Sequence, residues 1–240
     1  MTTAPTHGRR KHATGQLHTA RRILPRLGRI LRHLRPTHHL GSAASVDDAF
    51  LQRHGVRAVL WDVDGTLMGH HAVEIDPRVC GAFRSVTASA GVGHAIVSNC
   101  DEGRLLELAG IFPDLPVMIG YETPDGPAFR VRRGTAGRLR RLDGSPAGDP
   151  QASWRALRKP SGVLLEAALD ELGGVDPAAA LMVGDQYFTD IASANLAGVR
   201  SVKVPTLEPR SFPRANRIAQ WIERSIYRAL HGPVLPGPPG

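Results

Sequence analysis

Short apolar runs alternate with segments of helical periodicity between residues 42 and 208. The runs have the length and the uninterrupted apolar character of strands that are buried on both faces. We therefore predict strands at residues 58–61, 94–97, 116–119, 180–183 and 201–204, and helices at 77–89, 104–109, 162–172 and 189–197. A strand followed by a helix, repeated along the chain, is typical of an α/β protein. The pattern predicts a doubly wound, Rossmann-like parallel sheet of about five strands with helices on both faces.

Residues 121–158 interrupt this alternation. Gly, Pro and Arg dominate the segment, and residues 123–126 (Thr-Pro-Asp-Gly) are typical of a turn. We interpret the segment as an insertion or long loop in the 42–208 domain, large enough for a minimal cap but not for a large cap domain. Its arginines favour a solvated loop or contact with an acidic headgroup, and without interleaved aromatic residues they give little support to nucleic-acid binding. These arginines are Arg130, Arg132, Arg133, Arg138, Arg140 and Arg141.

The N-terminal region is basic and precedes the domain. Residues 1–22 lack hydrophobic periodicity and are predicted to be a disordered tail. Residues 23–41 are predicted to form a basic amphipathic helix, most regular from Pro25 to Leu34, followed by a linker. Two interpretations remain open for this helix: residues 21–35 contact an anionic membrane surface, or the helix docks on its own domain. Arg-rich N-termini also resemble organelle-targeting segments.

The C-terminal region contains a second amphipathic pattern. Residues 209–231 are predicted to include a helix whose apolar side chains form one stripe. The stripe consists of Ile218, Trp221, Ile222, Ile226 and Leu230. Residues 232–240 are rich in Pro and Gly and are predicted to be a disordered tail.

Composition excludes several classes of protein. The 240 residues carry a formal net charge of +8, but residues 1–40 hold nine Lys or Arg and no Asp or Glu, so that the rest of the chain is close to neutral. No apolar run approaches the ~20 residues that span a bilayer, which argues against an integral membrane protein. Two cysteines, Cys80 and Cys100, are too few for a disulfide framework. We expect a cytoplasmic protein, either free or peripheral at the inner membrane surface, with organelle targeting still open.

Polar groups follow the ends of three predicted strands, and a lysine precedes a predicted helix. The carboxyl ends of parallel strands meet at one edge of a sheet, where ligands bind in doubly wound folds. We therefore expect these groups to lie together. The segments are Trp61-Asp62-Val63-Asp64-Gly65-Thr66, Val97-Ser98-Asn99, Val183-Gly184-Asp185 with Asp190 five residues on, and Arg158-Lys159-Pro160.

The acidic residues of these segments predict a metal site. Asp62 and Asp64 fall on one side of an extended segment, and their mutual repulsion calls for a cation. Asp185 completes an oxygen-rich cluster of the kind that Mg²⁺ prefers, whereas zinc is a poorer fit because the motifs hold no His or Cys. We predict Asp62, Asp64 and Asp185 as ligands. Three roles are open for Asp190: it supports the ligands without binding the metal, it is an alternative ligand, or it is a charge at a helix N-terminus.

The order of these segments resembles the haloacid dehalogenase (HAD) superfamily of phosphatases. The resemblance implies that Asp62 is a nucleophile that forms an aspartyl-phosphate, and that Asp64 is the general acid and base whose backbone carbonyl also binds the metal. It further implies that Lys159 offsets developing negative charge in the transition state. Thr66, Ser98 and Asn99 are expected to bind the substrate phosphate.

Within that superfamily the chain is similar to the phosphatidylglycerophosphate phosphatase branch. The similarity extends from about Leu34 to Leu230 except for the insertion, although Gly65 stands where that branch commonly has Asn. It implies a phospholipid headgroup phosphate as substrate. Two alternatives stay open: a soluble sugar or nucleotide phosphatase, and a non-catalytic HAD-like module that binds membrane or nucleic acid. The matching segments are Leu34-Arg35-Pro36, Arg158-Lys159-Pro160, Gly184-Asp185-Gln186-Tyr187-Phe188-Thr189-Asp190-Ile191, Asn195, Gly198, Asn216-Arg217 and Glu223-Arg224.

Overall fold

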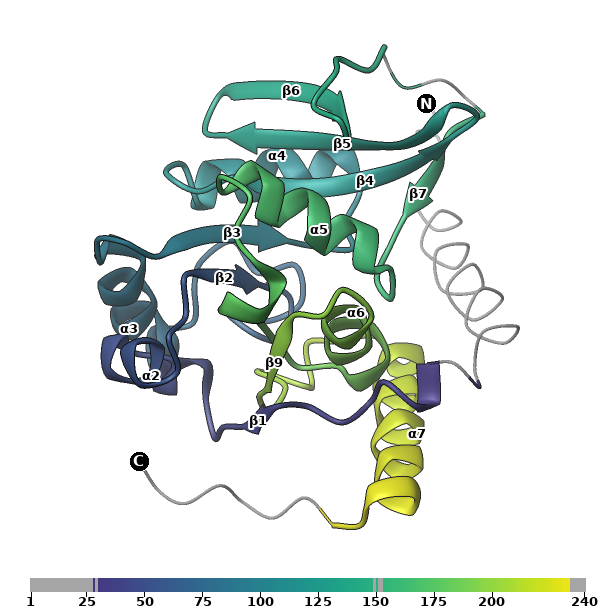
Figure 1. The fold of residues 1–240 in the computed structure, drawn as a ribbon. Helices are drawn as coiled ribbons and strands as arrows, with labels where there is room; N and C mark the ends of the chain where they lie inside the picture. Colours follow the sequence, from purple (N-terminus) through teal and green to yellow (C-terminus); the bar gives the residue numbers. More distant parts are fainter. Residues whose placement is uncertain (1–27, 29, 149, 151–152, 234–240) are drawn as a thin grey trace, which may run out of the picture.

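The computed structural model describes residues 28, 30–148, 150 and 153–233. Within these residues one mixed sheet has the strand order β1-β9-β8-β2-β3-β4-β5-β6, and β7 also pairs with β4 (Figure 1). The predicted tail 1–22 and most of the predicted tail 232–240 lie outside the described residues. The strands are β1 (His38–His39), β2 (Ala58–Trp61), β3 (Gly93–Val97), β4 (Val117–Thr123), β5 (Gly126–Arg133), β6 (Ala136–Arg141), β7 (Arg155–Leu157), β8 (Ala180–Gly184) and β9 (Arg200–Lys203).

The five predicted strands are β2, β3, β4, β8 and β9, and the strands that are neighbours among them pair in parallel. Alternate side chains of β2 enter the two hydrophobic cores on opposite faces of the sheet: Val59 and Trp61 enter one, and Ala58 and Leu60 enter the other. Burial on both faces explains the uninterrupted apolar runs. The structure confirms the α/β prediction.

Helices cover both faces of the sheet. Side chains from α2, α3 and α4 pack in one core, whereas those from α5 and α6 pack in the other. Asp76 and Asp101 cap the N-termini of α3 and α4 by accepting backbone N–H groups, which fixes where these helices begin. The helices are α2 (Asp48–Arg53), α3 (Pro77–Ala88), α4 (Glu102–Ile111), α5 (Gly162–Glu171), α6 (Ala192–Leu196) and α7 (Arg214–His231), with short turns η1 (Ala43–Ser45), η2 (Pro177–Ala179) and η3 (Tyr187–Ile191).

The segment 121–158 differs from the loop that we expected. It extends the sheet: β4 continues to Thr123, β5 and β6 follow antiparallel, and β7 returns to pair with β4. The sheet is therefore larger than the predicted five strands. Phe129 and Val131 of β5 are buried beneath α5 in the second core, and this apolar burial holds the hairpin in place.

Several arginines of this segment form ion pairs with neighbouring elements. Arg138 lies 2.6 Å from Glu171, and Arg140 lies 2.9 Å from Asp170. Arg130 pairs with Glu102 on α4. These ion pairs join the hairpin to the helices on both faces of the sheet, which a solvated loop would not do.

The described end of the predicted N-terminal helix lies against its own domain. Ile30 and Leu34 are buried with Tyr187, Ile191 and Tyr227. The amide of Asn195 donates to the backbone oxygens of residues 33 and 35, at 2.6 and 2.9 Å. For these residues the structure favours docking on the domain over membrane contact, and the preceding part of the helix lies outside the described residues.

Helix α7 packs through polar side chains and an aromatic ring. Gln220, Glu223 and Tyr227 are buried on its inner face, whereas most of the predicted apolar stripe is exposed. The exposed members of the stripe are Ile218, Trp221, Ile222 and Leu230. In the part of the chain that the structure describes, no helix has both the length and the apolar character needed to cross a bilayer.

Candidate active site

Strand ends bring the predicted groups to one edge of the sheet. Asp62 follows β2, and its amide donates to the carbonyl oxygen of Val183 in β8, at 2.9 Å. Ser98 is buried at the end of β3, and Asp185 is buried at the end of β8. Strand β7 ends two residues before Lys159, so the pairing of β7 with β4 carries the lysine to the same edge.

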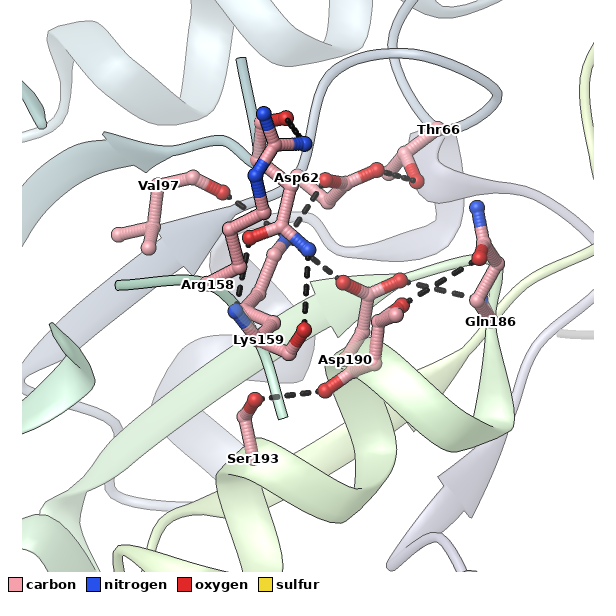
Figure 2. Close-up of polar contacts among 10 residues, drawn as sticks. Asp62, Thr66, Val97, Arg158, Lys159, Gln186, Asp190 and Ser193 are labelled. Atoms are coloured by element: carbon pink, nitrogen blue, oxygen red, sulfur yellow. Dashed lines mark hydrogen bonds and ion pairs between the residues drawn. The ribbon is translucent and has the colours of Figure 1, made fainter. Parts of the chain in front are cut away.

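Lys159 is the centre of the polar network in Figure 2. Its Nζ donates to Asp62 Oδ1 at 2.6 Å, to Asp190 Oδ1 at 2.7 Å and to the carbonyl oxygen of Val97 at 3.0 Å. These three bonds use all three ammonium protons. Burial alone would lower the pKa of Lys159, but the charges of Asp190 and Asp62 outweigh burial and raise it. The side chain is therefore a fixed positive charge.

Asn99 holds the backbone of Lys159 in place. Its Oδ1 accepts the Lys159 amide at 2.8 Å, and its Nδ2 donates to the Lys159 carbonyl oxygen at 3.1 Å. Arg158 adds a bond from Nη1 to the backbone oxygen of Asn99, at 3.0 Å. The predicted phosphate-binding residue Asn99 thus has its side-chain amide engaged with the loop that presents the lysine.

Asp62 is buried and bonded through both carboxylate oxygens. Lys159 donates to Oδ1, and the hydroxyl of Thr66 donates to Oδ2 at 3.1 Å. Burial and the nearby charge of Asp190 raise the pKa of Asp62 to about 7, although Lys159 acts in the opposite direction. Thr66, predicted to bind phosphate, therefore orients the predicted nucleophile.

Three buried carboxylates form a cluster suited to a divalent cation. Asp62, Asp185 and Asp190 each offer one oxygen, and these oxygens lie within 4.8 Å of one another. Lys159 pairs with Asp62 and Asp190 but, among the described residues, forms no ion pair with Asp185. Burial raises the pKa of Asp185 well above its usual range. Among the described residues Asp185 Oδ1 has no hydrogen-bond partner. An unpaired buried carboxylate oxygen beside two further carboxylates fits a divalent ion with oxygen ligands.

Asp190 differs from Asp185 in that both of its oxygens are engaged. Oδ1 accepts from Lys159, and Oδ2 accepts the backbone amide of Gln186 at 3.0 Å. Gly184 lets Asp190 approach this closely, because a Cβ at position 184 would lie 2.4 Å from Asp190 Cβ and Cγ. Lys159 and the backbone amide of Gln186 thus fix the Asp190 carboxylate within the cluster.

The side chain of Asp64, which we predicted as a metal ligand, is not among the three carboxylates whose oxygens lie within 4.8 Å of one another. Its Oδ1 accepts from Arg104 Nη2 at 3.2 Å and from the amide of His71 at 3.1 Å. The buried Arg104 also donates to the carbonyl oxygen of Ala72 at 2.8 Å. Metal binding by the Asp64 backbone carbonyl, which the HAD resemblance implies, stays a prediction.

Sequence reasoning missed three residues around the site. Arg104 lies next to Leu105 in the pattern of α4, where an arginine is ordinarily assigned to the solvent face. Gln220 Nε2 lies 3.5 Å from Asp185 Oδ2, and Glu223 accepts the amide of Tyr187. Gln220 and Glu223 are three residues apart and lie on the polar side of α7. From sequence alone, the polar side of an amphipathic helix is expected to face solvent.

Comparison with known proteins finds a family match in the C-terminal half of the chain. Residues 156–208, which contain Lys159, Asp185 and Asp190, match the HAD-hydrolase-like family model. The motif order and the site geometry agree with this match, so the chain is similar to the HAD-like hydrolases.

One curated relative is phosphatidylglycerophosphate phosphatase 1, chloroplastic, from Chlamydomonas reinhardtii. It is 26% identical over 196 residues, which is 79% of this chain. The match spans 61% of the length of that relative.

Two solved structures are also similar. An uncharacterized protein from Listeria monocytogenes serotype 4b matches with a TM-score of 0.41 and 19% identity, over 66% of this chain and 85% of that one. A 4-nitrophenylphosphatase from Thermotoga maritima matches with a TM-score of 0.28 and 14% identity, over 68% of this chain and 90% of that one.

Proposed function

We propose that the protein is a Mg²⁺-dependent phosphomonoesterase that acts through an aspartyl-phosphate on Asp62. One observation carries the proposal: a buried lysine joins Asp62 to Asp190, while Asp185 in the same cluster keeps an oxygen that no described residue bonds. A nucleophilic carboxylate, a fixed positive charge and a cation site thereby lie together. Asp62 and Asp185 would hold Mg²⁺, which when bound neutralises charge on the phosphoryl oxygens.

In the first step the Asp62 carboxylate attacks phosphorus, so that an oxygen–phosphorus bond forms to Asp62 and the bond to the leaving oxygen breaks. Asp64 gives its proton to that leaving oxygen. Lys159, bonded to Asp62 at 2.6 Å, offsets the negative charge that develops on the phosphoryl group. Thr66 keeps the attacking carboxylate in orientation.

In the second step water attacks the aspartyl-phosphate, and Asp64 takes the proton from this water. Arg104 acts on this step by fixing the position of the Asp64 carboxylate, whose Oδ1 lies 3.2 Å from Arg104 Nη2. Phosphate leaves, and the Asp62 carboxylate is regenerated.

The proposed substrate is the terminal phosphate of a phospholipid headgroup such as phosphatidylglycerophosphate. The relative from Chlamydomonas supports this substrate class. The described part of the 121–158 segment also supports it, because these residues extend the sheet sideways and form no helical cap. The proposed location is the cytoplasm or the inner membrane surface.

A phosphate-release assay with Mg²⁺ tests the proposal. Phosphatidylglycerophosphate in mixed micelles is compared with glycerol 3-phosphate and p-nitrophenyl phosphate, using the wild type, Asp62→Asn and the surface control Asp114→Asn. We expect Asp62→Asn to lose at least ~10³-fold in rate, because Asn keeps the shape but not the nucleophilic charge, and Asp114→Asn to match the wild type. Faster release from the small esters would replace the lipid with a soluble substrate. No release from any ester would favour a non-catalytic module.

A further inference from the structure

Helix α7 carries an apolar surface with no cover among the described residues. We define the outer face of α7 as Ile218, Trp221 and Ile222 together with Arg214 and Arg228. The three apolar side chains are 59%, 63% and 44% exposed. Spacings of three and four residues place them on one side of the helix. The helix itself, drawn in yellow, lies at the periphery of the molecule in Figure 1.

The orientation of α7 is fixed by contacts on its opposite side. Glu223 accepts the amide of Tyr187, and the ring of Tyr227 stacks on the ring of Tyr187 with centroids 4.0 Å apart. Gln220 reaches Asp185 in the cluster. The helix cannot turn its apolar stripe inward without breaking these contacts, so the exposed face is built into the fold.

The exposed charged side chains of α7 are all basic. The helix contains Arg214, Arg217, Arg224 and Arg228, and its only acidic residue, Glu223, is buried. Arg214, Arg217 and Arg228 are exposed. A helix with exposed aliphatic and Trp side chains flanked by arginine has the composition that inserts its apolar side at the headgroup boundary of a bilayer. Each arginine near an anionic surface adds to the attraction.

We propose that the outer face of α7 docks on the surface of an anionic phospholipid bilayer. Charge complementarity selects this occupant over two others. A second copy of α7 would bring arginines against arginines. The N-terminal residues 1–27, which hold six Lys or Arg and no Asp or Glu, would be repelled in the same way.

Docking has a consequence for the site, and this consequence rests on the proposed function. Gln220 contacts Asp185 from the inner face of the helix whose outer face meets the lipid. One helix therefore separates the carboxylate cluster from the bilayer. The docking itself does not depend on catalysis.

Trp221 reports on the docking directly. The full chain with Trp154→Phe keeps Trp61, which is buried, and Trp221. It is mixed with vesicles of phosphatidylcholine and phosphatidylglycerol at about 3:1, or of phosphatidylcholine alone. With the anionic vesicles we expect Trp221 emission to shift to the blue and to be quenched by bromine-labelled lipid. Neutral vesicles should leave the emission unchanged.

A matched pair of double variants tests the surface. Ile218→Ser with Ile222→Ser should weaken vesicle affinity by at least about tenfold, because two aliphatic side chains no longer leave water. Leu106→Ser with Leu142→Ser removes two leucines that are 52% and 41% exposed elsewhere, and should bind as the wild type does. Hydrolysis of p-nitrophenyl phosphate with Mg²⁺ should be equal in all three proteins.

Three results would overturn the docking proposal. The first is vesicle binding without any change at Trp221, which would assign the contact to another segment such as residues 1–27. The second is unchanged affinity in the Ile218 and Ile222 variant. The third is a dimer in which Trp221 is already shielded without lipid. Insertion of Trp221 by a protein that hydrolyses no phosphate ester would support docking and would refute the proposed function alone.

Discussion

Lys159 and Asp62 form a buried ion pair of 2.6 Å across 97 residues of sequence. The pair exists because the hairpin β5–β6 returns through β7, which pairs with β4 and ends two residues before the lysine. The segment that interrupts the βα alternation therefore positions Lys159 at the site. Asn99 completes the placement by bonding both the amide and the carbonyl oxygen of Lys159.

Gly184→Ala should damage the site although it replaces no charged group. A Cβ at this position would lie 2.4 Å from Asp190 Cγ, so Asp190 must move away from Lys159. We expect a loss of about 1–3 kcal/mol in the free energy of unfolding from overpacking, and at least about a tenfold loss of phosphatase rate. Gly81→Ala in α3 is the control, since a Cβ there meets nothing within 4 Å and favours the helix. Full activity in Gly184→Ala would show that the position of Asp190 does not matter.

Arg104→Ala should slow catalysis by misplacing Asp64. The variant loses the bonds from Arg104 to Asp64 and to the Ala72 carbonyl oxygen, at 3.2 and 2.8 Å. We expect kcat to fall by about 10²-fold with little change in KM, because a small misplacement of a catalytic group has effects of that size. Arg104→Lys should recover part of the rate. Arg84→Ala, which removes an exposed arginine of α3, is the control. A rise in KM at constant kcat would instead make Arg104 a substrate-binding residue.

Metal binding should have opposite effects on the wild type and Asp185→Asn. Without metal, burial raises the pKa of Asp185, so its ionised form destabilises the fold at neutral pH and Asn should be at least as stable. With Mg²⁺ the wild type should gain stability by mass action, and the variant should gain much less. Thermal unfolding with EDTA and with a Mg²⁺ series measures both effects, and Asp114→Asn should follow the wild type. An equal Mg²⁺-dependent gain in Asp185→Asn would remove Asp185 from the cation site.

Stability should fall at acidic pH through His94. Burial lowers its pKa from 6.5 to about 4, and its Nδ1 accepts a hydrogen bond from Trp61 Nε1 at 3.2 Å. Between these two values the unfolded chain binds a proton that the folded chain does not, so stability increases with pH in that window and is lost as pH falls from 6.5 to 4. The loss should be about 3 kcal/mol.

Urea unfolding at pH 7 and pH 4.5, compared between the wild type and His94→Gln, isolates this contribution from that of the carboxylates. Gln can accept the Trp61 bond but cannot bind a proton. The variant should lose less stability on acidification than the wild type. An equal loss of unfolding free energy in the two proteins would contradict the lowered pKa of His94 in the folded state.

The parallel core and most of the site could be predicted from sequence because both depend on local patterns. Strands buried on both faces are continuous apolar runs, and groups after their carboxyl ends, such as Asp62 and Asp185, must meet. The hairpin was missed although Phe129 and Val131 alternate with Arg130 and Arg132, because the arginines and glycines weakened the strand pattern.

Other features depend on tertiary contacts that no local pattern encodes. The amphipathic pattern of α7 located the helix and its apolar stripe, but only the packed structure shows that the stripe faces outward and that Gln220 faces the cluster. The pairing of Asp64 with Arg104, 40 residues away, likewise follows from where α4 packs on the sheet. The side-chain placement of Asp64 was therefore the part of the predicted metal set that the sequence could not supply.

Rapid acid quenching followed by mass spectrometry tests the central claim most directly. The protein is mixed with a hydrolysable phosphate ester and Mg²⁺, quenched within the first turnovers and digested. We predict one added phosphoryl group on the peptide that contains Asp62, absent from Asp62→Asn and longer-lived when Asp64 is replaced by Asn. Turnover with the phosphoryl group on another residue, or with no phosphorylated peptide in either protein, would contradict the account.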